Sequence, residues 1–218
     1  MLTTPKTRTK RKPSYVSDRV FLNVPYDKQF EPLYLAFIAG MCGFGLIPQA
    51  VLQIPGSKRR LERIFSLIRR CKLSFHDLSR VELDRKRPPT PRFNMPFELG
   101  LAVAWQRTGD PVHRWYVFEA KAHRVQKSLS DLNGTEIYVH RCKPRGVFQQ
   151  LTNALTRATH RPTVRELEAI YRDLRMAAET VKRDLRTQSL FESRAFEDLV
   201  FAASVSARNR IKSLRQNN

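Results

Sequence analysis

The stretch Lys72-Leu73-Ser74-Phe75-His76-Asp77-Leu78 decides the fold class of this 218-residue chain. It is a short apolar segment with the length and composition of a buried β-strand. A charged, proline-rich loop follows at 79–92, and apolar residues at helical spacing then run from Pro96 to about Gln106. A strand followed by a helix is the repeating unit of a parallel α/β sheet, so this segment predicts that class.

The same alternation continues on both sides of this segment. Further strands are expected at 19–24, 45–54, 115–119 and 136–140, and further helices at 29–41, 57–70, 122–132 and 146–158. Ser57 is expected to be the N-cap of the helix at 57–70. The pattern predicts an α/β fold whose five-stranded, mostly parallel sheet carries helices on both faces, as in flavodoxin-like proteins.

Three regions of the chain differ in composition. Residues 1–18 are basic and contain proline, and we expect a disordered tail there. Residues 19–160 hold the α/β domain. Residues 163–215 have helical periodicity, many charges and little strand signal, which predicts a C-terminal α-helical hairpin formed by 163–186 and 194–214.

The net charge is +20, from 40 Lys and Arg against 20 Asp and Glu. A field of this sign attracts polyanions, so non-specific nucleic-acid binding through the basic surface is one expected property. A well-solvated surface would account for the same excess. No helix-turn-helix or RNA-binding signature accompanies it, so the expected contacts are to phosphates rather than to bases.

The sequence also indicates the cellular compartment of the protein and whether it holds a metal site. Cys42, Cys71 and Cys142 share no metal-ligand spacing, and we expect buried thiols in a reducing compartment. The longest mostly apolar run, 33–47, is too short to span a bilayer, and no apolar signal core precedes the first strand. These features predict a cytoplasmic protein without a membrane segment or a metal site.

Glu98 is the leading candidate for chemistry. It lies in Asn94-Met95-Pro96-Phe97-Glu98-Leu99-Gly100, just inside the predicted helix and between two apolar residues. One interpretation is a helix-start residue, because Pro96 suits the first helical position and the helix dipole favours an acid two places later. The other is a functional site, because a carboxylate among apolar neighbours needs something to pair with.

Asp77, which ends the strand at 72–78, is the second candidate. In a parallel sheet, Asp77 and Glu98 would arrive at neighbouring strand ends, on the edge where open α/β sheets bind ligands. Two acids there suit chemistry on a sugar ring, in which a carboxylate meets a developing oxocarbenium ion. Where a leaving group needs a proton, Asp77 or His76 is the available donor, although a lone histidine in an apolar strand is more often a core residue.

Three segments together resemble one superfamily. They are Phe21-Leu22-Asn23-Val24-Pro25-Tyr26-Asp27, Phe75-His76-Asp77-Leu78-Ser79 and the Asn94–Gly100 segment. They are similar to segments of the group that unites nucleoside 2-deoxyribosyltransferases with TIR and TIR-like domains. The segment Val125-Gln126-Lys127-Ser128-Leu129-Ser130-Asp131-Leu132-Asn133-Gly134 also resembles bacterial TIR-like nucleotide-binding proteins. The resemblance covers residues 19–160 and implies a TIR-like fold for them.

The resemblance implies an enzyme that cleaves an N-glycosidic bond. It makes Glu98 and Asp77 the catalytic residues, with Asp77 in contact with the base or ribose. The expected substrate-binding residues are Asn23, Pro25, Tyr26, Arg92, Asn94 and Asn133. Two of these have a plainer interpretation, because Ser130–Gly134 is a good turn sequence and Tyr26 would also suit the edge of the core.

The resemblance also implies a nucleotide or dinucleotide ligand, with NAD as substrate and no separate cofactor. The protein would then be an NAD glycohydrolase, a bacterial defence or stress effector, and a homo-oligomer, since TIR-type enzymes often act when assembled. Two other functions compete with this one. A non-catalytic nucleotide-sensing module would use Glu98 as an acceptor for a ribose hydroxyl, and a basic nucleic-acid-binding protein would contact phosphates.

The enzyme hypothesis makes a geometric prediction. Asp77, Glu98 and Asn23 should converge on one cleft at the carboxyl edge of the sheet. Charged groups of the basic loop at 85–92 should flank that cleft, where they would meet the phosphates of a dinucleotide.

Overall fold

The structure is a computed structural model that describes residues 18–53, 59–83 and 87–216. The tail expected at 1–18 therefore lies outside the described residues except for Asp18, and so does the expected N-cap Ser57. In the loop at 85–92, Arg85 and Lys86 also lie outside them.

The five strands form one parallel sheet in the order β2-β1-β3-β4-β5, which confirms the predicted fold class. Their bounds are β1 Arg19–Asn23, β2 Ile47–Gln49, β3 Leu73–Asp77, β4 Arg114–Glu119 and β5 Ile137–Val139. β2 is shorter than the expected 45–54, and a 3₁₀ helix at Val51–Gln53 follows it. β2 pairs only with β1 and contains Pro48, and a residue without an N–H is tolerated at such a sheet edge.

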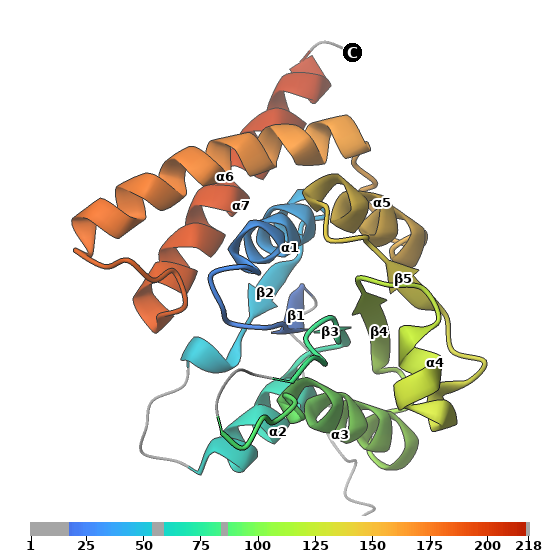
Figure 1. Cartoon of the computed structure of the whole chain (residues 1–218). Helices are drawn as coiled ribbons and strands as arrows, with labels where there is room; N and C mark the ends of the chain where they lie inside the picture. The colour runs from blue at the N-terminus through green and yellow to red at the C-terminus, as the bar shows by residue number, and fades with distance from the viewer. Residues whose placement is uncertain (1–17, 54–58, 84–86, 217–218) are drawn as a thin grey trace, which may run out of the picture.

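Helices cover both faces of the sheet (Figure 1). One face carries α1 (Glu31–Gly43) and α5 (Pro144–Ala154), and the other carries α2 (Arg60–Arg70), α3 (Asn94–Thr108) and the short α4 (Arg124–Ser128). α3 begins two residues before the expected Pro96. The helix expected at 122–132 is divided into α4 and a 3₁₀ helix at Ser130–Leu132.

The C-terminal region is the expected hairpin, formed by α6 (Val164–Asp184) and α7 (Ser193–Gln216). A capping box between Thr163 and Glu166 starts α6. Both helices pack on α1, which is thus enclosed between the sheet and the hairpin (Figure 1). A Cβ at Gly40 would overlap the end of the Leu151 side chain of α5, and one at Gly43 would overlap that of Leu167 of α6, so a larger residue at either position would require the facing leucine to shift. The hairpin therefore shares the hydrophobic core of the α/β part.

The strand order places a topological switch point between β1 and β3. The chain leaves β1 for β2 on one side and later returns to β3 on the other side of β1. In open α/β sheets a crevice forms at this point, outside the carboxyl ends of the strands. Among the described residues, no helix combines the length and apolar character needed to cross a membrane.

Candidate functional site

Glu98 lies on α3 near the switch point, and its side chain is almost completely enclosed, with 5% exposure. Since α3 begins at Asn94, Glu98 is its fifth residue, and the first turn of α3 contains no acid. The stabilising effect of a helix dipole is confined to the first turn. The helix-start interpretation of Glu98 therefore loses its physical basis.

The carboxylate of Glu98 forms no hydrogen bond and no ion pair with any other described residue. Burial raises its pKa to about 7, against a lowering by the charge of Arg60 from the start of α2. A buried carboxylate without a partner carries a desolvation cost that a satisfied one avoids. A group with these properties at a sheet edge is a candidate for a functional role.

Tyr26 shares the surroundings of Glu98. Burial first, and then the charge of Glu98, raise the pKa of Tyr26 far above its ordinary value, while Arg60 and a backbone hydrogen bond at Val51 oppose the shift. The tyrosine ring also packs against Phe191 of the α6–α7 connection, with ring centroids 5.9 Å apart. The structure thus brings together groups from the ends of β1 and β2 and the starts of α2 and α3. Pro25, which comes directly before Tyr26, is buried.

Asn23, at the end of β1, supports the start of α3 rather than an open cleft. Its Nδ2 donates to the Met95 carbonyl oxygen (3.1 Å) and to His76 Nδ1 (2.9 Å). The amide of Asn23 is buried, and the Met95 contact fixes which of its atoms donates. Asn23 therefore positions the turn of α3 that precedes Glu98.

Beneath Asn23 lies a buried chain of hydrogen bonds through two histidines. Because Asn23 donates to Nδ1 of His76, the other ring nitrogen carries the proton and donates to Ser74 Oγ (2.9 Å). Ser74 Oγ lies 3.1 Å from His113 Nε2, and His113 Nδ1 donates to the Cys71 carbonyl oxygen (2.9 Å). Burial, and to a smaller extent the charge of His113, lower the pKa of His76 to about 3. The His76 ring within this row of hydrogen bonds is therefore neutral. His76 is a satisfied core residue and not an accessible acid.

The expected convergence of Asp77 with Glu98 does not occur. Successive side chains on a strand alternate between the two faces of the sheet. His76 contacts Phe21, which belongs to the hydrophobic cluster under α2 and α3. Asp77 faces the opposite side of the sheet, which α1 covers, and contacts His140 there. The His140 ring centroid lies 6.4 Å from that of Phe37 of α1. Asp77 is fully buried, with its oxygens bonded to His140 Nε2 (2.9 Å) and the Ser79 N–H (2.9 Å). We therefore withdraw the catalytic assignment of Asp77.

A charged cluster lies beside the switch point, in the loops after β1 and β3. Asp27 accepts two hydrogen bonds from Arg80 (2.8 and 3.1 Å) and one from Arg92 (3.2 Å). Burial acts to raise the pKa of Asp27, but Arg80 and then Arg92 outweigh it and lower the pKa. These residues line a pocket of about 290 Å³ together with Glu82 and Leu83. Two guanidinium groups on one carboxylate leave one positive charge in excess. Arg92 belongs to the loop at 85–92 where charged groups are expected, whereas Arg80 precedes that loop.

The two candidate asparagines lie at different places. Asn94 is the exposed first residue of α3, on the carboxyl side of the sheet. Asn133 is also exposed, but it follows the 3₁₀ helix after α4 and comes just before β5, on the amino side of the sheet. The turn interpretation of Ser130–Gly134 is the correct one, because this segment returns the chain to the start of a parallel strand. The structure therefore does not bring Asn133 together with Glu98.

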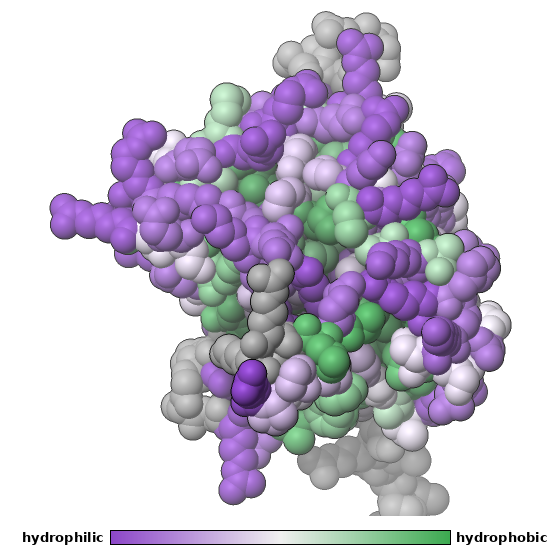
Figure 2. All heavy atoms as spheres, in the orientation of Figure 1, coloured by the Kyte–Doolittle hydropathy of each residue, from purple (hydrophilic) through white to green (hydrophobic). Residues whose placement is uncertain are grey.

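The face in Figure 2 is largely hydrophilic, with hydrophobic side chains gathered near its centre, in the region of β3 and the start of α3. Leu83 (62% exposed), Phe93 (66%) and Phe97 (55%) belong to these segments. Phe93 and Phe97 lie one helical turn apart, since the Phe97 N–H donates to the Phe93 carbonyl oxygen. These exposed aromatic rings at the start of α3 offer a surface on which a planar base can stack.

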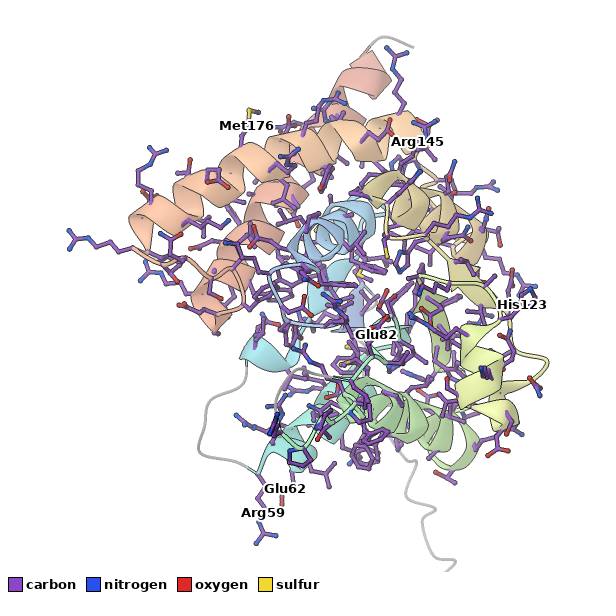
Figure 3. The ribbon with its side chains drawn as sticks, in the orientation of Figure 1. Arg59, Glu62, Glu82, His123, Arg145 and Met176 are labelled. Atoms are coloured by element: carbon purple, nitrogen blue, oxygen red, sulfur yellow. The ribbon has the colours of Figure 1, made fainter. Side chains whose placement is uncertain are left out.

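Sequence reasoning missed several residues of this arrangement. Arg60 has no individual signal among the basic residues of the helix expected at 57–70, and Phe97 is notable in the sequence only as an apolar neighbour of Glu98. Phe93 has no assigned role there. Arg80 follows Ser79 directly, so its place after β3 was a usable signal. Figure 3 shows Arg59 and Glu62 extending from the start of α2 and Glu82 near the middle of the face.

Within the described residues, no group of three or more His, Cys, Asp or Glu side chains is arranged to hold a metal ion. Comparisons of the chain with protein-family models, with curated proteins and with solved structures found no match.

Proposed function

We propose that the chain binds a nucleotide at the β1–β3 switch point and cleaves its N-glycosidic bond, with NAD as substrate and Glu98 as the catalytic group. The observation that carries this proposal is the state of Glu98, a carboxylate with 5% exposure that has no hydrogen-bonding partner among the described residues. A largely buried carboxylate without a protein partner is available to stabilise positive charge that develops on a ribose.

NAD suits a site with one carboxylate. Its nicotinamide ring is cationic and leaves as a neutral molecule when the C1′–N bond breaks, so no acid has to protonate it. Water then forms the new bond to C1′ and releases a proton, which gives ADP-ribose. The assignment of Asp77 to the core removes the candidate proton donor, and this favours NAD over neutral nucleosides.

The neighbouring groups fit the remaining parts of a dinucleotide. Arg80 and Arg92 carry guanidinium groups that would meet the pyrophosphate, and Phe93 or Phe97 would stack on a base. From the resemblance to TIR-like domains, we place the reaction in the bacterial cytoplasm, in a defence or stress response and in an assembled homo-oligomer.

A second candidate is a nucleotide-sensing module without turnover. It is favoured by the pKa of Glu98 near 7, because the neutral form present at that pH can hydrogen-bond a ribose hydroxyl without acting on C1′.

The test is nicotinamide release from NAD by the wild type and by Glu98→Gln, over a range of protein concentrations that includes assembled species. We expect the substitution to lower the rate about 10²–10³-fold, as for the loss of one preorganised electrostatic group. Glu62→Gln, an exposed site on α2, is the matched control and should leave the rate unchanged. Equal rates in wild type and Glu98→Gln would overturn the catalytic assignment.

Thermal shift with NAD separates the two candidates. If wild type and Glu98→Gln are both stabilised and neither releases nicotinamide, the module senses nucleotides. Ligand at a hundred times its Kd stabilises a fold by about 2.7 kcal/mol, which such a measurement detects. No cleavage and no shift would reject both functions.

A further inference from the structure

A second pocket lies away from Glu98, at the carboxyl ends of β4 and β5. Its volume is about 910 Å³, and its floor includes His140, which is 1% exposed. The charged side chains that line it are all cationic: Lys121, Arg141, Lys143 and Arg145. The size falls within the usual range for small-molecule sites.

Most of this positive charge has no counter-ion among the described residues. Lys121, Arg141 and Lys143 form no ion pair with any described residue. Arg145 bonds Glu168 of α6 (2.6 Å), and it lies beside α6 in Figure 3. The nearest buried acid on β4, Glu119, is already paired with Arg124. Three cations that share one concave surface repel one another, so an anion in the pocket would relieve that repulsion.

Buried polar contacts build the loop that carries these cations. His140 Nδ1 accepts from the Cys142 N–H (3.1 Å), and the His140 carbonyl oxygen accepts from the Lys143 N–H (3.1 Å). Arg141 and Cys142, which lie between these two residues, both have φ of +55°, a conformation that is unfavourable for residues other than glycine. A Cβ at position 146 would overlap the His140 carbonyl group, so only glycine allows α5 to start this close. These contacts fix the backbone that carries Arg141, Lys143 and Arg145 beside the pocket, and the three side chains are exposed.

We propose that this pocket is a second ligand site, which binds the phosphate groups of a phosphorylated small molecule. Cations without carboxylate partners recognise phosphate oxygens. Apart from the buried His140, the lining contains no aromatic side chain on which bases could stack, so recognition rests on phosphate. The site is independent of the chemistry proposed for Glu98, because β3 and its loops separate the two places.

The experiment measures binding of inorganic pyrophosphate to the full chain by calorimetry, with inorganic phosphate and ribose 5-phosphate as further probes. The pocket variant is Lys121→Gln, Arg141→Gln and Lys143→Gln combined. The control removes the same charge from exposed positions of α6 by Arg165→Gln, Arg172→Gln and Arg183→Gln. We expect the pocket variant to bind pyrophosphate about tenfold more weakly or worse, since hydrogen bonds to charged groups contribute about 1.5–3 kcal/mol each. The control and Glu98→Gln should bind within twofold of wild type.

Other outcomes would overturn the proposal. Equal weakening in the pocket variant and the α6 control would mean general charge attraction. Weaker binding of a single-stranded DNA 20-mer with unchanged pyrophosphate binding would mean a nucleic-acid surface instead. The melting temperature of each variant shows whether it is folded, and Arg141→Gly is a second variant that removes a cation while relieving the unfavourable φ. Because Glu98→Gln is measured in parallel, failure here and failure of the glycosidic proposal give different results.

Discussion

Asp77 and Glu98 are both buried acids near the carboxyl edge of one sheet, but they differ in their hydrogen bonding. Asp77 is fully enclosed on the α1 side, and both of its oxygens accept hydrogen bonds. Glu98 is nearly as buried on the α3 side, but its carboxylate has no such partner among the described residues. A satisfied buried acid contributes to stability, whereas an unsatisfied one costs stability and needs another reason for its presence. Substitutions at the two sites should therefore change stability in opposite directions.

The largest expected effect is at Asp77. Asp77→Ala would leave the Ser79 N–H without its acceptor inside the core, and His140 Nε2 with only Ser79 Oγ (3.1 Å) as a partner. We expect a loss of about 3–5 kcal/mol in the free energy of unfolding, measured by urea denaturation. Asp131→Ala, at an exposed position, should change it by less than about 0.5 kcal/mol. A stable Asp77→Ala protein that has lost NAD cleavage would contradict the structural role of Asp77 and would make it a site residue again.

The second effect has the opposite sign and depends on pH. The pKa of Glu98 is about 7 in the folded state and about 4.5 in the unfolded chain, so the folded state binds more protons between these values. Stability due to this group is complete below pH 4.5 and falls as the pH rises through 7. Glu98→Gln removes this loss, so we expect the variant to be more stable than wild type by up to about 3 kcal/mol at pH 8 and equal to it near pH 4.

The measurement is the difference in free energy of unfolding between wild type and Glu98→Gln from pH 4 to pH 8. Glu62→Gln, exposed on α2, should give a flat difference over the same range. A flat difference for Glu98→Gln too would mean that the Glu98 carboxylate is solvated or paired in solution.

The sequence predicted the sheet, its strands and the C-terminal hairpin because these depend on local patterns. Short apolar runs such as 72–78 alternate with helical periodicity, and a parallel sheet follows from that alternation alone. The exact start of α3 was not available from the pattern, because Pro96 is favourable at the first helical position and is also tolerated elsewhere in the first turn. Because α3 begins two residues before Pro96, Glu98 lies beyond its first turn, and this decides between the two interpretations of Glu98.

The site itself stays a prediction, and the structure supports part of its geometry. Glu98 and Asn23 are both candidates, and Asn23 bonds the turn of α3 that contains Met95 and precedes Glu98. Asp77 was misassigned because the sequence locates a residue along a strand, whereas a side chain's face depends on the pleat and on the layers that cover the sheet. His140, the partner of Asp77, comes 63 residues later, and no local pattern links the two.

The third effect concerns the support of Glu98. Asn23→Ala would remove the donor to the Met95 carbonyl oxygen and to His76 Nδ1, which leaves the buried His76 Nδ1 without a donor and the Met95 carbonyl oxygen with only its bond inside α3. We expect a loss of about 1–3 kcal/mol in stability. If Asn23 positions α3, the rate of NAD cleavage should also fall in the variant while the dependence of that rate on pH keeps its midpoint near 7. Asn153→Ala, at an exposed position of α5, is the control and should change neither quantity. An unchanged rate in Asn23→Ala would reduce the role of Asn23 to packing.

The smallest expected effect is the difference between substitutions at the carboxyl edge and at the amino edge of the sheet. Asn94 and Asn133 are both exposed, but Asn94 begins α3 on the carboxyl side and Asn133 precedes β5 on the amino side. Since both side chains are solvated, each alanine substitution should change stability by less than about 0.5 kcal/mol. The two variants should differ in the KM for NAD, with an increase for Asn94→Ala and wild-type behaviour for Asn133→Ala. An increase for Asn133→Ala would place part of the substrate on the amino side, where no α/β switch-point site binds its ligand, and the location of the site would then be wrong.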